Sequence, residues 1–113
     1  MKGWVELFRV DDQANSRLFI ARRPITLKRA QRLVGGYVEP VPDWHHVMHN
    51  DGQRYPALAL CNEDGRSLGL PVNLLATMRW ERELRIKLNP RHFLVGTVVL
   101  MFGDVHFTEE GWG

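Results

Sequence analysis

The sequence of 113 residues has a single cysteine, Cys61, and no long apolar segment. One cysteine excludes an intramolecular disulfide bond, which is typical of proteins in a reducing compartment. No stretch approaches the ~20 apolar residues that cross a membrane, and the first residues do not resemble a signal peptide. We therefore expect a cytoplasmic protein that has no membrane partner.

Motifs of the common catalytic and cofactor sites are also missing. The chain has no Gly-x-Ser-x-Gly elbow, no phosphate-binding P-loop and no dinucleotide-binding fingerprint. The pair Gly35-Gly36 precedes a strand-like segment, whereas glycines that cradle phosphate precede a helix. Cys61 ends an apolar segment, which favours an unreactive core residue. An enzyme is therefore the less favoured class, and no cofactor is expected.

Acidic residues are absent between Gln13 and Val38, although the net charge of the whole chain is only +2. Arginine outnumbers lysine, and its planar guanidinium group suits phosphate. The basic residues that we expect to bind an anionic partner here are Arg22, Arg23, Lys28, Arg29 and Arg32. The last three share one flank of an expected helix and would neutralise phosphates, or else they form an ordinary solvated helix face.

Length and composition predict one globular domain over residues 1–113, because 44% of the residues are hydrophobic and 25% are charged. Thr26 is the expected N-cap of a helix from Leu27 to about Val34. Residues 45–54 read as a polar loop, Pro71 as the start of a helical turn through Thr77, and residues 78–88 as either helix or strand. Strands are expected at residues 4–10, 18–21, 37–44, 55–61 and 93–103. These elements predict an α+β fold with an antiparallel or mixed sheet of about five strands and one or two helices packed on one face.

Four short motifs occur in a fixed order: residues 33–39 (LVGGYVE), 62–65 (NEDG), 70–73 (LPVN) and 95–100 (VGTVVL). With these motifs the chain resembles the family catalogued as domain of unknown function 3846, which is carried mainly by phages, prophages and plasmids. The resemblance covers roughly residues 27–102 and leaves a tail at 104–113. It departs from the family in a longer His-rich loop and a charged insert at 79–92. It implies a phage protein or other protein of a mobile genetic element, and it implies no particular activity.

Two side-chain clusters are weaker candidates for chemistry. His45 and His49 have the spacing of metal ligands on a helix, with His46 beside them, but they fall in an expected loop, where solvated histidines are the alternative. Paired carboxylates for acid–base chemistry are offered by Glu39, Glu63 and Asp64, of which the last two also fit an ordinary turn.

Several residues are candidates for contacts with a partner. Trp44, Trp80 and Trp112 would indicate a protein interface if they were exposed. Trp80 lies beside Arg79 and Arg82, and Tyr55 beside Arg54, so either ring is a candidate for stacking on bases. Asn73 is either a helix cap or a ligand contact. The apolar last strand has to be covered or paired, which suggests a homodimer through an edge strand.

Three functions follow from these observations. The first is a non-enzymatic accessory protein of a mobile element that binds and blocks a host factor, such as a defence protein or its nucleotide signal. The second is a nucleic-acid-binding protein that uses the basic helix. The third is a metal-dependent hydrolase that uses the histidine loop.

Overall fold

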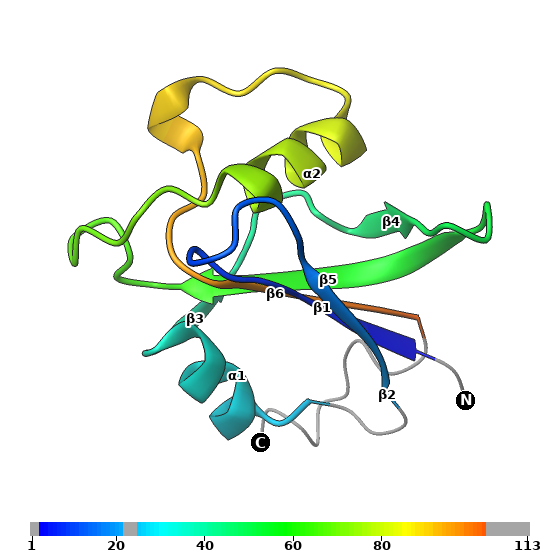
Figure 1. The fold of residues 1–113 in the computed structure, drawn as a ribbon, viewed down its shortest axis with the longest axis horizontal. Helices are drawn as coiled ribbons and strands as arrows, with labels where there is room; N and C mark the ends of the chain where they lie inside the picture. Colours follow the sequence, from blue (N-terminus) through cyan, green and yellow to red (C-terminus); the bar gives the residue numbers. More distant parts are fainter. Residues whose placement is uncertain (1–2, 22–24, 104–113) are drawn as a thin grey trace.

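The structure, a computed structural model, describes residues 3–21 and 25–103. It contains one antiparallel sheet of six strands with two α-helices (Figure 1). The strand order is β2-β1-β6-β5-β3, and β4 pairs with β5 beside this path. The elements are β1 (Gly3–Phe8), β2 (Arg17–Ala21), α1 (Leu27–Val34), β3 (Val38–Pro40), β4 (His46–Met48), β5 (Arg54–Asn62), α2 (Leu74–Leu84), the short 3-10 helix η1 (Pro90–His92) and β6 (Val98–Gly103).

The two helices cover opposite faces of this sheet, with α1 on one side and α2 on the other (Figure 1). Strand β1 explains why both faces need cover, since Trp4 and Phe8 pack under α2 while Val5 and Leu7 pack under α1. The predicted α+β class and antiparallel sheet are confirmed. The expected placement of the helices on one face is not what is found, because the central strands are apolar on both sides.

Helix α1 has the predicted limits. Thr26 Oγ1 accepts a hydrogen bond from the backbone N–H of Arg29 at 3.2 Å, as an N-cap does. The helix ends at Gly35, whose φ of +80° lies in the left-handed region that glycine adopts readily.

A second contact fixes the end of α1 against the sheet. Asn62 at the end of β5 donates from Nδ2 to the carbonyl of Val34 at 3.1 Å. A Cβ atom on Gly36 would lie 2.9 Å from that same Nδ2 atom, so the residue at position 36 must be small. The motifs at residues 33–39 and 62–65 therefore meet in space, and their glycines and asparagine serve the fold.

Helix α2 begins later than predicted. The expected turn from Pro71 is wrong, because Val72 forms a bridge to Val95 and Asn73 is the N-cap. The ambiguous segment 78–88 is helical as far as Leu84, with Trp80 buried against the sheet. Among the described residues, no helix is both long and apolar enough to cross a membrane.

Part of the expected loop at 45–54 is a strand. Strand β4 pairs with the start of β5, and the two form a hairpin whose turn includes Gly52 at φ +81°. Val47 is fully buried between exposed His46 and Met48, which is the alternation of a half-buried strand. The last strand, β6, lies in the middle of the sheet between β1 and β5. The reason for expecting a dimer through that strand is therefore removed.

Candidate anion-binding groove

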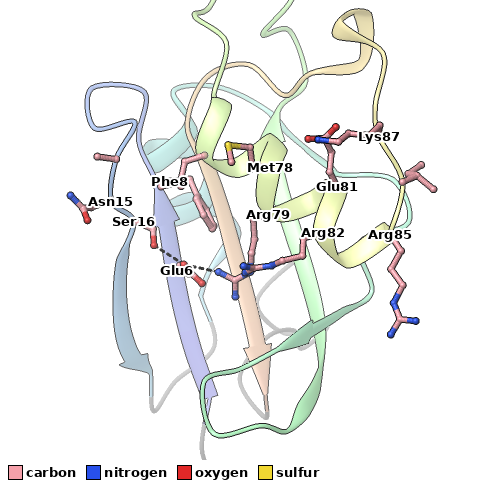
Figure 2. A pocket seen from close by; sticks show the side chains of 13 residues that line it. Glu6, Phe8, Asn15, Ser16, Met78, Arg79, Glu81, Arg82, Arg85 and Lys87 are labelled. Atoms are coloured by element: carbon pink, nitrogen blue, oxygen red, sulfur yellow. Dashed lines mark hydrogen bonds and ion pairs between the residues drawn. The ribbon is translucent and has the colours of Figure 1, made fainter.

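An open groove runs along α2 on the face of the sheet that this helix covers (Figure 2). It consists of two depressions of about 730 and 940 Å³, which share Glu6, Arg79, Arg82 and Arg85. We call this surface the α2 groove. One end is bounded by residues 14–16 and by α2 with residues 85–87, and the other by the β4–β5 hairpin.

The floor of the α2 groove is an ion pair between β1 and α2. Glu6 is buried, and its Oε2 atom accepts hydrogen bonds from Ser16 Oγ at 2.6 Å and from Arg79 Nη1 at 3.1 Å (Figure 2). Arg79 Nε lies 3.7 Å from Glu83 Oε1, beyond hydrogen-bond distance, and it is buried without an acceptor.

The carboxylates of the groove are held by groups of the chain itself. Glu6 is engaged by Ser16 and Arg79, and Glu83 Oε1 accepts the backbone N–H of Met48 at 3.3 Å. Glu81 Oε2 accepts the backbone N–H of Leu88 at 2.7 Å. The carboxylates keep their charge, but they are outnumbered, because the groove is lined by three glutamates and by five arginine or lysine side chains.

The remaining charges of the groove are positive and unpaired. Within the described part of the chain, no carboxylate lies at ion-pair distance from any of four basic side chains of the groove. These are Arg54, Arg82, Arg85 and Lys87. Arg85 points outward from the end of α2 (Figure 2), and its φ of +59° is a left-handed conformation that arginine rarely adopts. Backbone strain of this kind is characteristic of binding and catalytic sites.

Apolar side chains line the groove beside these cations. Phe8 and Leu75 contribute to its wall, and Met78 and Ile86 are 63% and 55% exposed. Exposed methionine adapts its shape to flat or irregular apolar groups. The arrangement suits a ligand that combines an apolar body with negatively charged groups.

The basic residues predicted from the sequence lie elsewhere. Lys28, Arg29 and Arg32 are exposed on α1, across the sheet from the α2 groove, and two of them border a small depression of about 400 Å³. Arg22 and Arg23 lie outside the described residues. The sequence therefore predicted one cationic surface, and the structure contains a second one on the opposite face.

Two of the tryptophans predicted to contact a partner are buried, so that prediction is wrong for them. Trp44 is 1% exposed and Trp80 is 6% exposed, with Trp80 Nε1 donating to the carbonyl of Pro42 at 3.0 Å. Neither ring is accessible to a protein partner or to a nucleic-acid base, because both fill the core between α2 and the sheet. Trp112 lies outside the described residues.

Two further predictions concern single residues. Asn73 is fully buried and acts as a helix cap, so it does not contact a ligand. Cys61 is buried, and its Sγ donates to the carbonyl of Glu39. Burial, followed by the charge of Glu39, raises the pKa of the Cys61 thiol to about 11, which keeps the sulfur protonated and unreactive.

The three candidate metal-ligating histidines do not converge. His45 and His46 are exposed neighbours at the start of β4, while the His49 ring packs 4.7 Å from Trp4 and 5.3 Å from Phe102 between centroids. Over residues 3–21 and 25–103, no group of three His, Cys, Asp or Glu side chains is arranged to hold a metal ion.

The carboxylates proposed for acid–base chemistry are also in ordinary surroundings. Glu39 is exposed on β3, and Glu63 and Asp64 are exposed in the turn after β5. The backbone of this turn is bonded as turns are, with Asp64 N–H donating to Asn62 Oδ1 at 2.8 Å.

The residues of the α2 groove had a weak signal in the sequence. Arg54, Arg79 and Arg82 were noted only as neighbours of aromatic rings, and the segment that contains Arg85 was ambiguous between helix and strand. Comparison with known proteins adds nothing to this description, because no family model, no curated protein and no solved structure matches the chain. The resemblance to the phage and plasmid family therefore remains a prediction.

Proposed function

We propose that this protein is a non-enzymatic binding protein that holds an anionic ligand in the α2 groove. The observation that carries the proposal is the division of charge in the groove. Its carboxylates bond to Arg79, Ser16 and backbone N–H groups, while Arg82, Arg85 and Lys87 have no carboxylate partner among the described residues. A ligand that brings negative charge would complete this arrangement.

A nucleotide is the ligand class that fits best. Arginine binds phosphate through two parallel N–H···O bonds, and the groove presents Arg82 and Arg85 beside exposed Met78 and Ile86. The phosphates would lie at the arginines and the base against the apolar side chains. A depression of about 730 Å³ is within the range of sites that hold small molecules.

The biological role that we propose for this binding rests only on the genomic context that the family resemblance implies. In a phage, prophage or plasmid, a small cytoplasmic protein of this kind would act as an anti-defence protein. It would sequester the nucleotide signal of a host defence system, or it would block a host defence protein that carries an acidic surface. The motifs that carry the resemblance serve the fold, so they neither support nor oppose this role.

Isothermal titration calorimetry tests the proposal with four probes: ATP, a cyclic dinucleotide, inorganic pyrophosphate and poly-glutamate. We expect at least one of the two nucleotides to bind with a dissociation constant on the order of 1–10 μM and pyrophosphate to bind more weakly, because it lacks an apolar body. Binding of poly-glutamate in preference to both nucleotides would contradict a nucleotide as the ligand and favour an acidic protein partner. Heat changes indistinguishable from dilution for all four probes would contradict an anion-binding groove.

Nucleic-acid binding through α1 is a second candidate. Its support is that Lys28, Arg29 and Arg32 are exposed together and have no carboxylate partner among the described residues. Fluorescence anisotropy with a labelled duplex and a labelled single strand would then show affinity that falls steeply with salt concentration. The reversal Arg29→Glu with Arg32→Glu would abolish this signal, and an unchanged signal would contradict the role of α1. We do not propose the metal-dependent hydrolase, because the histidines point to different surroundings.

A further inference from the structure

Strand β2 lies at the edge of the sheet, and the described part of the chain leaves its apolar side chains exposed. Strand β2 pairs with β1, and none of the described residues pairs with its other edge. Leu18, Phe19 and Ile20 are 45%, 38% and 63% exposed, with Leu18 and Ile20 on one face of the sheet and Phe19 on the other. Such a row of exposed apolar groups beside free backbone N–H and C=O groups is a template for pairing with another strand.

Apart from Arg17 at its start, this edge has none of the features that keep edges unpaired. Between Leu18 and Ala21 there is no charged residue and no proline. The opposite edge of the sheet is different, because β3 is only three residues long and contains Glu39 and Pro40. Charge, proline and short length are the usual means of protecting an edge. This contrast between the two edges of the sheet indicates that another strand covers the β2 edge.

We propose that a second copy of this chain covers it, with the two β2 strands paired antiparallel around Phe19 so that the two sheets join into one. In this register Phe19 lies opposite Phe19 of the second copy, and Leu18 lies opposite Ile20. Leu18, Phe19 and Ile20 then each meet an apolar residue. The two Arg17 side chains are kept apart, since each lies opposite Ala21.

The second copy is favoured over an unrelated partner because the edge is complementary to itself. A two-fold axis places the same patch on both sides of the interface, and the sequence Leu-Phe-Ile reads as apolar in both directions. The one charged residue of the strand, Arg17, lies at its end, so residues 18–21 offer no charge that would select a partner of opposite sign. Because the paired strands are only five residues long, we expect a small interface and a dissociation constant on the order of 10 μM.

The dimer has a consequence for the other face of the molecule. The two-fold axis that relates the β2 strands is perpendicular to the joined sheet, so both α2 helices lie on the same face. Leu18 borders both the β2 edge and the α2 groove. The two grooves would therefore flank the dimer axis and present their cations to the same side.

Sedimentation equilibrium measures the proposed dimer directly. At about 100 μM, wild-type protein is expected to be mainly dimeric and the Ile20→Lys variant monomeric, because the lysine removes the apolar contact with Leu18 and places charge on the edge. The matched control is Leu68→Lys, since Leu68 is 62% exposed in a turn far from β2 in the sequence. Circular dichroism checks that both variants fold. A monomeric wild type, or an Ile20→Lys variant as dimeric as the control, would overturn the proposal.

Cross-linking tests the register. In a Cys61→Ala background, Phe19→Cys places two thiols opposite each other across the axis, where the Cα atoms of paired residues lie roughly 4.5–5.5 Å apart, within reach of a disulfide. Mild oxidation should give a covalent dimer. Arg17→Cys in the same background should give none, because each residue 17 is opposite residue 21 of the other copy. Equal cross-linking at both positions, or none at position 19, would contradict this pairing.

Discussion

Asn73 joins three parts of the chain through one buried amide. Its Oδ1 atom accepts the backbone N–H of Ala76 at 3.1 Å, and its Nδ2 atom donates to the carbonyls of Phe8 and Gly96, each at 2.9 Å. Strand β1, helix α2 and the segment before β6 therefore depend on a side chain that is fully buried. This position requires asparagine, because no other side chain of similar size can both donate and accept these hydrogen bonds.

The variant Asn73→Ala should lower the free energy of unfolding by about 3 kcal/mol, because it removes a cap and leaves two buried carbonyls without donors. Urea denaturation followed by tryptophan fluorescence measures this loss. The matched control is Thr26→Ala, which removes the exposed N-cap of α1 and should cost about 1 kcal/mol. Equal losses in the two variants would show that burial of Asn73 contributes nothing.

Cys61 provides a prediction about pH. The thiol pKa is raised from 9.0 to about 11, so the folded protein holds this proton between those values while the unfolded chain releases it. The free energy of unfolding should therefore decrease as the pH rises from 9 to 11, and this part of the decrease should be absent in Cys61→Ala. At pH 8, iodoacetamide should label the folded protein roughly 100-fold more slowly than the urea-unfolded chain, since less thiolate is present. Labelling at similar rates would contradict a buried thiol.

At the scale of single elements, α2 ends in a residue that lowers the stability of the fold but adds a positive charge to the α2 groove. Arg85 caps this helix in the left-handed conformation that glycine usually supplies, which costs about 1 kcal/mol for an arginine. The same residue places a guanidinium group on the α2 groove, where the proposed function uses it.

The variant Arg85→Gly should therefore raise the free energy of unfolding by about 1 kcal/mol and weaken nucleotide binding by roughly tenfold, through loss of one charged contact. Asp43→Gly is the control, because Asp43 has a similar φ of +61° but lies outside the α2 groove. It should leave binding unchanged. A stabilised Arg85→Gly variant that binds as well as wild type would show that Arg85 is only a strained cap.

Elements with local signals were predictable, and those decided by distant contacts were not. Thr26 and Gly35 mark both ends of α1 within the sequence itself, and the helix has the predicted limits. Strand β4 was missed because its only buried residue is Val47, and that residue is covered by parts of the chain far away in sequence. The segment 78–88 was ambiguous because its helix is stabilised mainly through Trp80, whose burial requires the sheet.

At the scale of the whole molecule, the sheet separates two cationic surfaces. The basic α1 surface arises from residues close together in sequence, so composition alone located it. The α2 groove joins Glu6 and Ser16 to Arg79, which is 73 residues from Glu6. Residues this far apart form no recognisable sequence motif. Only the folding of the sheet and α2 brings these three side chains together. The α+β class was predictable from the sequence, and the groove was not.

The short motifs noted in the sequence contribute to the fold of the whole molecule. Gly36, Asn62 and Asn73 belong to those motifs, and each holds a helix end against the sheet. Residues of the charged segment 79–92 instead supply much of the α2 groove. The motifs that serve the fold and the residues of the proposed ligand site are therefore different parts of the sequence.

The most direct test of the proposed function compares charge reversals on the two faces. One variant carries Arg82→Glu and Arg85→Glu in the α2 groove, and the other carries Arg29→Glu and Arg32→Glu on α1, so their net charges are equal. Calorimetric titration with the nucleotide that binds wild type best should show affinity reduced by roughly 100-fold in the first variant and nearly unchanged in the second. Equal losses would indicate that only net charge matters, and a loss confined to the α1 variant would place the ligand on the opposite face. Either result would contradict nucleotide binding in the α2 groove.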